Sequence, residues 1–314
     1  MILLVGCADD DAPLAAIAAE LLARDEPYVV FDPDDPLATV GRAWHPDREA
    51  VVTTSTATIC LDEICAAYLR PASRPGRAAQ NCRALSTVLT WSEFTPAVVV
   101  NRPAACAANT SKPYQLEMIR AFGFATPATL TTTSPDAARA FVQEVGRAVY
   151  KSVSADRSMV GEVDPRDTGR LRDVVHCPTQ FQQLVDGDDL RVHVVGGEAH
   201  ALRIRSMETD YRYVPPEGAL PTATLAELDP DPRGRLIAMT RAMGLRFAGI
   251  DLRESGDGTL YCLEVNPSPG FTFYERLSGV PIAPFVADLL THETPDLEPS
   301  REKECVHAAQ RSDM

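Results

Sequence analysis

The segment from Asp251 to Asn266 constrains the fold of this chain more than any other. It reads DLRESGDGTLYCLEVN, in which two apolar runs flank an Asp-Gly pair, the pattern of a β-hairpin. If Asp257 and Gly258 form a two-residue turn, counting back along both strands places Asp251 opposite Glu264, with Cβ atoms about 4.5–5.5 Å apart. Asn266 follows on the same face, roughly 7 Å along the strand. The hairpin therefore brings two carboxylates and an amide oxygen together.

These three oxygen-bearing side chains predict a magnesium site. Like charges opposed across a sheet destabilise it unless another charge cancels them. Hard oxygen ligands suit Mg²⁺, which proteins usually hold with one or two carboxylates plus the phosphates of a substrate. The flanking runs FAGI and LYC indicate burial, which disfavours the alternative of a solvated acidic hairpin. We therefore expect Asp251, Glu264 and Asn266 to be metal ligands.

Composition excludes several classes of function. The chain has 314 residues, 45% of them hydrophobic, which predicts about two domains with full cores. Its net charge of −14 argues against non-specific nucleic-acid binding and against an anionic membrane surface. No apolar run approaches the roughly 20 residues of a membrane helix, and the acidic start MILLVGCADDD is unlike a signal peptide. The eight cysteines form no CxxC pair, so we expect them to be small buried hydrophobes, reduced in the cytoplasm.

The first third of the chain predicts a parallel sheet. Residues 2–6 read as a buried strand, 12–24 as a helix and 28–31 as a second strand, a βαβ unit of Rossmann-like topology. No GxGxxG follows the first strand, and three acids stand there instead, so dinucleotide binding is not expected. The other elements expected in this part are a strand and a helix within 51–70, a helix over 79–93 and a strand over 97–101.

The rest of the chain changes from parallel to antiparallel patterns. Ser111 and Ser134 are expected to cap helices over 112–122 and about 135–145. From Thr179 the alternation predicts antiparallel strands, two of them joined at Gly196-Gly197. The strands expected are 148–152, 179–185, 189–195 and 198–206, and the later helices are about 231–243 and 281–291. The fold class is therefore α/β followed by α+β.

Two lysines are candidates for binding an anion. Lys151 ends the apolar strand AVYK and is followed by Ser152 and a polar segment, so it can meet a phosphate as a point charge. Lys112 begins a helix, where the helix dipole disfavours a cation but favours an anion that the lysine then helps to hold. The alternative for each is a lysine exposed to solvent.

A strand followed by an acidic turn is a candidate nucleotide site. The strand end at Gln182, Gln183, Leu184 and Val185 offers backbone groups that can read an adenine edge. An acid just beyond it can accept hydrogen bonds from ribose hydroxyls. The alternative is a charged hairpin tip.

Four arginines gather in the antiparallel part, namely Arg191, Arg203, Arg205 and Arg212. Because Arg191 and either Arg203 or Arg205 lie on strands joined by a turn, we expect their guanidinium groups to share one face and to bind a phosphate or a carboxylate. The alternative is pairing with surface acids. The three histidines between 176 and 200 lack the tight spacing of metal ligands.

Taken together, these segments resemble the ATP-grasp fold, and within it the RimK-like branch. The resemblance covers about residues 97–292 and depends on six motifs in a fixed order. They are NRPxxxxxNxxK (101–112), GFxTPxTL (123–130), YKS (150–152), FQQLVDGDDLRVHVVG (181–196), IRSxxxDYRY (204–213) and GIDLR…LEVNPSPGF (249–271). With the patterns above, it implies a Rossmann-like N-terminal domain over 1–96, a central ATP-grasp subdomain with a phosphate-covering flap over 97–180, a C-terminal subdomain with the magnesium site over 181–292, and a disordered tail over 293–314.

The resemblance also implies roles for residues at matching positions. Lys112, Lys151 and Ser152 would bind ATP phosphates, while Gln182, Gln183, Leu184 and Val185 would form the adenine hinge and Asp189 would hold the ribose. Asp251, Glu264 and Asn266 would hold two Mg²⁺ ions, for which Mn²⁺ is a substitute. Arg205 would steady the transferred phosphoryl group or acyl phosphate, Arg212 would face the acceptor, and Lys151 would act with both in catalysis.

The implied function is an ATP-dependent carboxylate–amine (or hydroxyl) ligase that forms an acyl phosphate and releases ADP and phosphate. One alternative is a maturase that makes side-chain ester or amide links in a ribosomal peptide, although such maturases usually carry Gly-Gln-Trp-like residues where this chain has SPGFTFYE. Another is a nucleotide-binding regulatory protein without catalysis. The expected partner is a small-molecule, amino-acid or peptide substrate, and a homodimer is allowed. Acceptor choice is expected to depend on the SPGF turn at 268–271.

Overall fold

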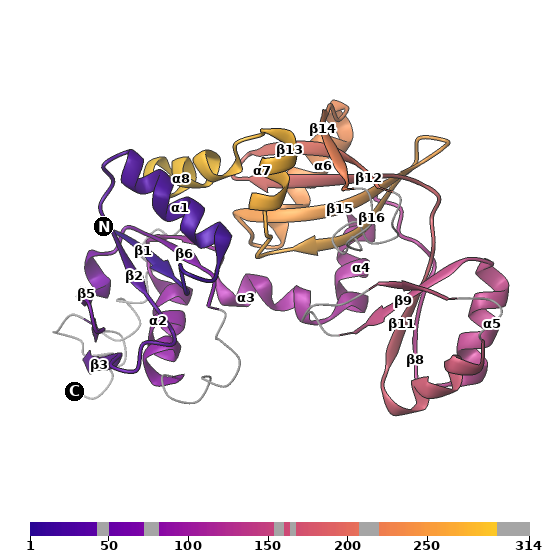
Figure 1. Cartoon of the computed structure of the whole chain (residues 1–314), viewed down its shortest axis with the longest axis horizontal. Coiled ribbons are helices and arrows are strands. Elements are labelled where there is room, and N and C mark those ends of the chain that lie inside the picture. The colour runs from indigo at the N-terminus through magenta and orange to yellow at the C-terminus, as the bar shows by residue number, and fades with distance from the viewer. Residues whose placement is uncertain (43–49, 72–81, 154–159, 164–167, 207–219, 294–314) are drawn as a thin grey trace, which may run out of the picture. The chain divides into compact units, whose positions relative to one another are not determined.

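The computed structural model describes residues 1–42, 50–71, 82–153, 160–163, 168–206 and 220–293 (Figure 1). The chain forms two compact units, one from Met1–Pro103 with Ala283–Met314 and the other from Ala104–Ile282. Since it divides once, near Pro103, the further division expected at residue 180 stays a prediction. Apart from Glu293, the predicted tail lies outside the described residues. None of the described helices is long and apolar enough to cross a membrane.

The N-terminal unit contains a four-stranded parallel sheet in the order β2-β1-β6-β7. Its strands are β1 (Ile2–Val5), β2 (Tyr28–Phe31), β6 (Ala66–Leu69) and β7 (Val98–Val100). The helices are α1 (Ala12–Ala23), α2 (Cys82–Phe94) and, from Ala283 on, α8 (Ile282–His292). All residues of β1 and β6 are buried, as expected of parallel strands covered on both faces, and α1 and α2 lie on opposite sides of the sheet (Figure 1). The Rossmann-like prediction is confirmed.

Helix α1 is anchored at both ends by ion pairs. Asp11 caps it by accepting from the Leu14 N–H at 2.9 Å and also pairs with Arg70 at 2.8 Å. Arg24, just after the helix, pairs with Asp288 of α8 at 2.5 Å. At least one of the three acids after β1 therefore has a structural role.

The expectation of a strand and a helix within 51–70 is wrong. This segment forms two strands, a short 3₁₀ helix and β6, and a further strand precedes it. The antiparallel strands are β3 (Thr39–Arg42), β4 (Val51–Thr53) and β5 (Thr58–Cys60), and the 3₁₀ helix is η1 (Leu61–Glu63). The segment is rich in Val and Thr, whose branched Cβ atoms favour strands. Thr54 Oγ1 accepts from the Ala57 N–H at 3.0 Å and closes the turn between β4 and β5.

The second unit begins with helical segments and an antiparallel sheet in the order β10-β9-β11-β8. The helical segments are α3 (Pro103–Cys106), η2 (Ala107–Thr110), α4 (Lys112–Ala121), α5 (Pro135–Val145) and η3 (Thr168–His176). The strands are β8 (Thr129–Thr132), β9 (Ala148–Ser152), β10 (Gly161–Glu162) and β11 (Thr179–Gln183). Phe181 of β11 packs with α5 and η3, so this face of the sheet is apolar.

A five-stranded antiparallel sheet, in the order β14-β13-β12-β15-β16, completes the unit. Its strands are β12 (Gly187–Val195), β13 (Glu198–Arg205), β14 (Thr222–Ala226), β15 (Phe247–Ser255) and β16 (Leu260–Asn266), with helices α6 (Pro230–Ala242) and α7 (Thr272–Ser278). Leu190, Val192 and Val194 of β12 point into a core shared with α4 and α6. Because side chains alternate along a strand, Asp189, Arg191 and His193 lie on the opposite face. The predicted change from parallel to antiparallel structure is confirmed.

Candidate active site

Asp251 and Glu264 are directly paired across the β15–β16 hairpin, as predicted, and Asn266 pairs with Gly249. The two predicted carboxylates therefore share one face with the predicted amide, and this face also carries Arg191.

The turn of this hairpin differs from the predicted turn. Toward the turn the next pair is Leu252 with Cys262, so a β-bulge leaves Leu263 without a partner in β15. The Ser255 N–H donates to the Thr259 carbonyl at 3.0 Å, which gives a three-residue turn over 256–258. The predicted two-residue turn is wrong, but the extra turn residue and the bulge offset each other, and the predicted register results.

Asp257 explains the longer turn. Its Oδ1 accepts from the Ser255 hydroxyl at 2.6 Å and from the Thr259 N–H at 3.0 Å. These hydrogen bonds lower the pKa of Asp257 to about 2. Gly258 adopts φ of +83°, the left-handed conformation that a three-residue hairpin loop requires.

Each carboxylate of the pair has a basic partner. Asp251 Oδ1 lies 2.6 Å from Arg191 Nη1, and Glu264 Oε1 lies 3.1 Å from Lys112 Nζ. The carboxylate side chains are 30% and 26% exposed, whereas those of Arg191 and Lys112 are 4% and 6% exposed. Asn266 Oδ1 accepts from the Ser268 N–H at 2.9 Å and keeps a second lone pair. Three oxygen donors on one face fit the ligand preference of Mg²⁺.

The edge of β16 is completed by a helix side chain that the sequence analysis missed. Gln115 of α4 donates from Nε2 to the Val265 carbonyl at 2.7 Å, and its Oε1 accepts from the Val265 N–H at 2.9 Å. Val265 lies between Glu264 and Asn266, so Gln115 fixes the backbone that carries both predicted ligands. The sequence indicates burial of Gln115 only through its position, because it shares a helix face with Lys112, Leu116 and Ile119, all of which are buried.

Arg191 is enclosed by the side chains of Tyr274 and His193 and by the backbone at Gly249. Its guanidinium carbon lies 5.1 Å from the centre of the Tyr274 ring, and its Nε lies 3.5 Å from His193 Nε2. A Cβ atom at Gly249 would clash with the guanidinium group, so glycine is needed there. Burial, aided by the charge of Arg191, lowers the pKa of His193 well below its usual value. His193 is therefore a neutral partner of Arg191.

The predicted phosphate lysine of the central sheet is also buried. Lys151 Nζ donates to Gln182 Oε1 at 3.2 Å, and Gln182 Nε2 donates to Thr129 Oγ1 at 3.1 Å. Ser152 follows at the exposed end of β9. Lys151, Gln182 and Thr129 thus form one hydrogen-bonded row on the face of the sheet away from α5.

Some backbone N–H groups of the predicted hinge are already hydrogen-bonded within the protein. The N–H groups of Gln183 and Leu184 donate to the carbonyls of Ala128 and Arg147, at 2.8 and 2.9 Å. These two N–H groups therefore cannot be the free donors that the strand end was expected to offer.

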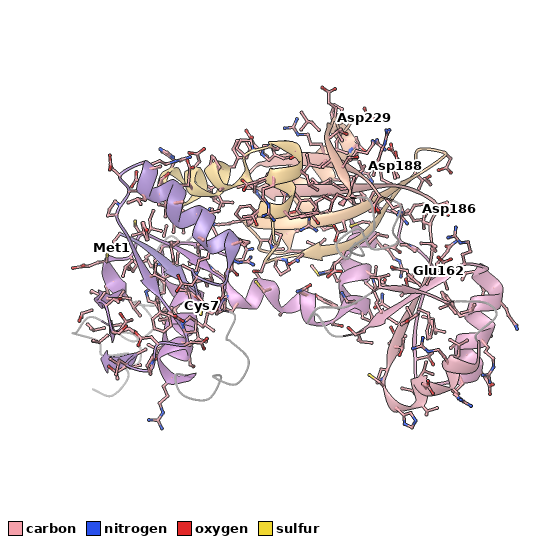
Figure 2. All side chains as sticks on the ribbon, in the orientation of Figure 1. Met1, Cys7, Glu162, Asp186, Asp188 and Asp229 are labelled. Atoms are coloured by element: carbon pink, nitrogen blue, oxygen red, sulfur yellow. The ribbon has the colours of Figure 1, made fainter. Side chains whose placement is uncertain are left out.

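Arg253, which the sequence analysis did not single out, joins the hinge to the predicted ribose acid. It donates from Nη1 to the Val185 carbonyl at 3.1 Å and pairs through Nη2 with Asp189 at 2.9 Å. Burial raises the pKa of Asp189, and the charge of Arg253 opposes that shift. Two further acids precede Asp189 along the chain (Figure 2). Asp186 lies in the connection before β12, and Asp188 lies at the start of β12.

Two cavities meet at the carboxylate pair. The first has about 820 Å³ of open space and is lined by the hinge, by Lys151 and Asp189, and by Leu263 of the bulge. The second, about 860 Å³, is lined by Arg191, Asn266 and the segment from Gly270 to Tyr274. Asp251 and Glu264 line both cavities. The structure thus brings most of the predicted site residues to two cavities that share Asp251 and Glu264.

The expectation that Arg191 shares a face with Arg203 or Arg205 is wrong. Leu202 lies opposite Arg191, so alternation places both other arginines on the far face of the sheet. Arg203 instead pairs with Asp188 and Glu254, at 2.7 and 2.6 Å, as the surface-acid alternative required. Arg205 is exposed at the end of β13. Arg212 and most of the predicted flap lie in segments that the structure leaves undescribed.

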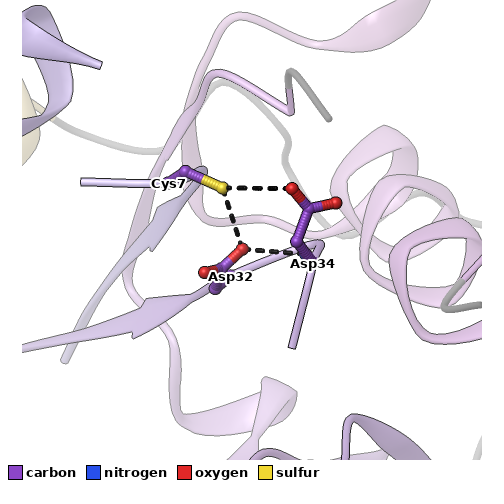
Figure 3. Close-up of side chains that lie close together, drawn as sticks. All are labelled: Cys7, Asp32 and Asp34. Carbon is purple, nitrogen blue, oxygen red and sulfur yellow. Dashed lines mark hydrogen bonds between the residues drawn. The ribbon is translucent and has the colours of Figure 1, made fainter. Parts of the chain in front are cut away.

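A separate polar group lies in the N-terminal unit. Cys7 Sγ is 2.9 Å from Asp32 Oδ1 and 3.7 Å from Asp34 Oδ2, and Asp32 also accepts from the Asp34 N–H at 2.8 Å (Figure 3). These bonds account for the proximity of the three side chains. The cysteines whose state is described are free thiols, as predicted. The expectation that they are buried is wrong for Cys65 and Cys177, which are exposed, and Cys7, although buried, has polar partners.

Comparison with known proteins agrees with this architecture. A family model described as the RimK-like ATP-grasp domain matches residues 116–290, more than half of the chain. A probable alpha-L-glutamate ligase of Pseudoalteromonas translucida is 27% identical over 216 residues, which are 65% of this chain and 70% of that protein.

Solved structures share the fold. The ATP-grasp ligase PsnB, in a complex with a precursor variant, Mg and ADP, is 29% identical with a TM-score of 0.79, over 92% of this chain and 97% of PsnB. The macrocyclase MdnC from Microcystis aeruginosa, bound to the precursor peptide MdnA, shares the fold at 21% identity, with a TM-score of 0.78 over 92% of this chain and 99% of MdnC. This chain therefore belongs to the RimK-like ATP-grasp family, and it is an ATP-grasp ligase.

Proposed function

We propose that the protein joins a carboxylate to an amine through an acyl phosphate and releases ADP and phosphate. The nucleotide binds in the cavity beside the hinge, with its ribose at Asp189 and its phosphates at Lys112, Lys151 and Ser152. Asp251, Glu264 and Asn266 hold Mg²⁺, which supplies charge neutralisation at the phosphates.

The observation that carries this proposal is the position of the carboxylate pair between two cavities. One cavity has the hinge and Lys151, and the other has Arg191 and the segment after the SPGF turn. A nucleotide in the first cavity and an acceptor in the second would meet at Asp251 and Glu264. We therefore assign the second cavity to the acceptor carboxylate.

The chemistry follows from that placement. An oxygen of the substrate carboxylate attacks the γ-phosphorus, the bond to the β,γ-bridging oxygen breaks, and ADP leaves. The amine then attacks the acyl carbon, phosphate leaves with the bonding electrons, and the amine loses a proton. Positioning of the reacting groups and fixed positive charge supply most of the acceleration. The roles of Arg205 and Arg212 stay predictions from the family resemblance.

A second candidate is maturation of a ribosomal peptide. The likeness to PsnB and MdnC spans 92% of this chain, including its N-terminal part, whereas the glutamate ligase match spans 65%. Both solved neighbours were captured with precursor peptides. In this case the carboxylate in the second cavity belongs to an Asp or Glu side chain of a peptide.

The test is ADP release with Mg²⁺ and ATP, screened over amino acids, dipeptides and peptides encoded nearby. Glu264→Gln is expected to abolish ADP formation, while Glu254→Gln, whose carboxylate pairs with Arg203, keeps it. Turnover by Glu264→Gln would contradict the metal assignment. Nucleotide binding without ADP release for every acceptor would support the non-catalytic alternative.

A further inference from the structure

The two carboxylates of the site are neutralised within the protein. Arg191 balances Asp251 at 2.6 Å, and Lys112 balances Glu264 at 3.1 Å. Two negative and two positive charges therefore cancel before any metal ion is present. A divalent cation that enters this group has to share or replace a protein cation.

The two protein cations differ in the contacts that hold them. Arg191 is enclosed between Tyr274 and His193, and it occupies space that only a glycine at 249 leaves open. Its guanidinium group cannot leave Asp251 without repacking its surroundings. Arg191 is therefore a fixed counter-ion.

Lys112 is held by its ion pair with Glu264. It is the first residue of α4, and Glu264 is its sole ion-pair partner in the part of the chain that the structure describes. A cation at a helix N-terminus is unfavourable through the helix dipole, so Lys112 is retained there by Glu264. The lysine ammonium is a compact charge on a flexible stem of four carbons.

Lysine is rare in this chain, so its presence at position 112 is unusual. The 30 basic residues include three lysines, at 112, 151 and 303, and all others are arginine. Two of the three lysines thus belong to the proposed nucleotide site. Arginine would bind a carboxylate through two parallel hydrogen bonds, whereas lysine binds it as a point charge and exchanges more readily.

We propose that Glu264 holds Lys112 as a surrogate cation and exchanges it for the divalent cation, which frees Lys112 for the nucleotide phosphates. This inference rests on the proposed function. In the metal-free protein the four side chains are neutral together and Lys112 is occupied. After the exchange both the cation and Lys112 face the phosphates, so the site attracts a polyphosphate strongly only then. Metal and nucleotide consequently bind with positive coupling, which is typically 5–150-fold in proteins.

The first experiment measures Mn²⁺ binding to the nucleotide-free protein by electron paramagnetic resonance. Lys112→Met removes the cation that competes for Glu264, so the Mn²⁺ dissociation constant is expected to fall about tenfold, which corresponds to about 1.4 kcal/mol. Lys112→Arg, a stronger competitor, is expected to raise it. Lys112→Gln repeats the first result if the Met variant folds poorly. An unchanged or weaker Mn²⁺ affinity in both neutral variants would overturn the exchange.

The second experiment measures ADP binding by calorimetry in EDTA. Glu264→Gln releases Lys112 without metal, so this variant is expected to bind ADP several-fold more tightly than the wild type, and Lys112→Met/Glu264→Gln is expected to lose the gain. Equal ADP affinity of Glu264→Gln and wild type in EDTA would contradict the inference. Failure of the proposed function is distinct, because the wild type would then bind no ADP even with Mg²⁺, while the Mn²⁺ titration would still report on the Lys112–Glu264 pair.

Discussion

Gln115 forms two hydrogen bonds with the backbone of Val265, 150 residues later in the chain, and so takes the place of a neighbouring strand. Gln115→Leu leaves the Val265 N–H and carbonyl unpaired in a buried position. We expect the free energy of unfolding to fall by about 2–6 kcal/mol, because each of the two unpaired buried groups costs about 1–3 kcal/mol. Urea denaturation measures this loss. Gln143→Leu, at an exposed position of α5, is the matched control, and equal stability of the two variants would contradict the role of Gln115.

Gly249→Ala is expected to disturb the site through Arg191. The added methyl group would meet the guanidinium group and lie 2.6 Å from Pro269 Cβ, so both the counter-ion of Asp251 and the SPGF turn have to shift. Overpacking of this kind costs about 1–3 kcal/mol in free energy of unfolding, and ADP formation should fall with it. Gly256→Ala adds the same methyl group where no atom lies within 4 Å. Thermal melting and ADP release are compared for both variants, and a wild-type result for Gly249→Ala would refute this account.

Gln180→Leu is expected to stabilise the protein. Gln180 is 1% exposed on the Lys151 side of β11, and neither amide atom has a hydrogen-bond partner in the described structure. Replacing unpaired buried polar atoms with an apolar group of similar size should raise the free energy of unfolding by about 1–2 kcal/mol. Urea denaturation provides the measurement. A less stable variant would mean that the Gln180 amide is hydrogen-bonded in solution.

Stability should depend on pH through His193. Burial lowers the pKa of this histidine well below its ordinary value of 6.5, and the charge of Arg191 acts in the same direction. The unfolded chain therefore binds a proton near pH 6.5 that the folded protein does not. The stabilisation is full above that pH and is lost as the pH falls, at up to about 1.4 kcal/mol per pH unit for one proton.

His193→Phe isolates this contribution, since a ring still packs against Phe247 and Tyr274. We expect urea denaturation between pH 7.5 and 5 to give a shallower decline of the unfolding free energy than in the wild type. Some decline remains, because the pKa of His200 is also lowered by burial. His292→Gln, at the exposed end of α8, is the control. An unchanged slope for His193→Phe would show that another group is responsible.

The features that could be predicted are those set by local pattern. The alternation from Thr179 and the Gly196-Gly197 turn are sufficient to predict β12 and β13. The apolar runs near the N-terminus are sufficient to predict a parallel sheet. The same turn also contained information that was not used. Counting across it pairs Val195 with Glu198 and places Leu202, not an arginine, opposite Arg191.

Features set by distant contacts could not be read from the sequence. The bulge at Leu263 leaves no signature, because a leucine between Cys262 and Glu264 fits ordinary alternation as well. The correct Asp251–Glu264 register arose because two offsets cancelled. Gln115 and Arg253 act on backbone carbonyls 150 and 68 residues away, and no local pattern identifies such partners.

The two cavities that meet at Asp251 and Glu264 have further consequences for how such an enzyme can diversify. In the proposed assignment, four of the eight residues that line the acceptor cavity belong to one short stretch after β16, whereas the nucleotide cavity is lined by residues of several strands and their connections. Under this assignment, substitutions confined to residues 267–278 are expected to change which carboxylate is ligated while the residues proposed to bind the nucleotide stay unchanged. Exchange of this segment between relatives is a direct route to new acceptor specificity, as long as the incoming carboxylate still reaches the same pair of acids.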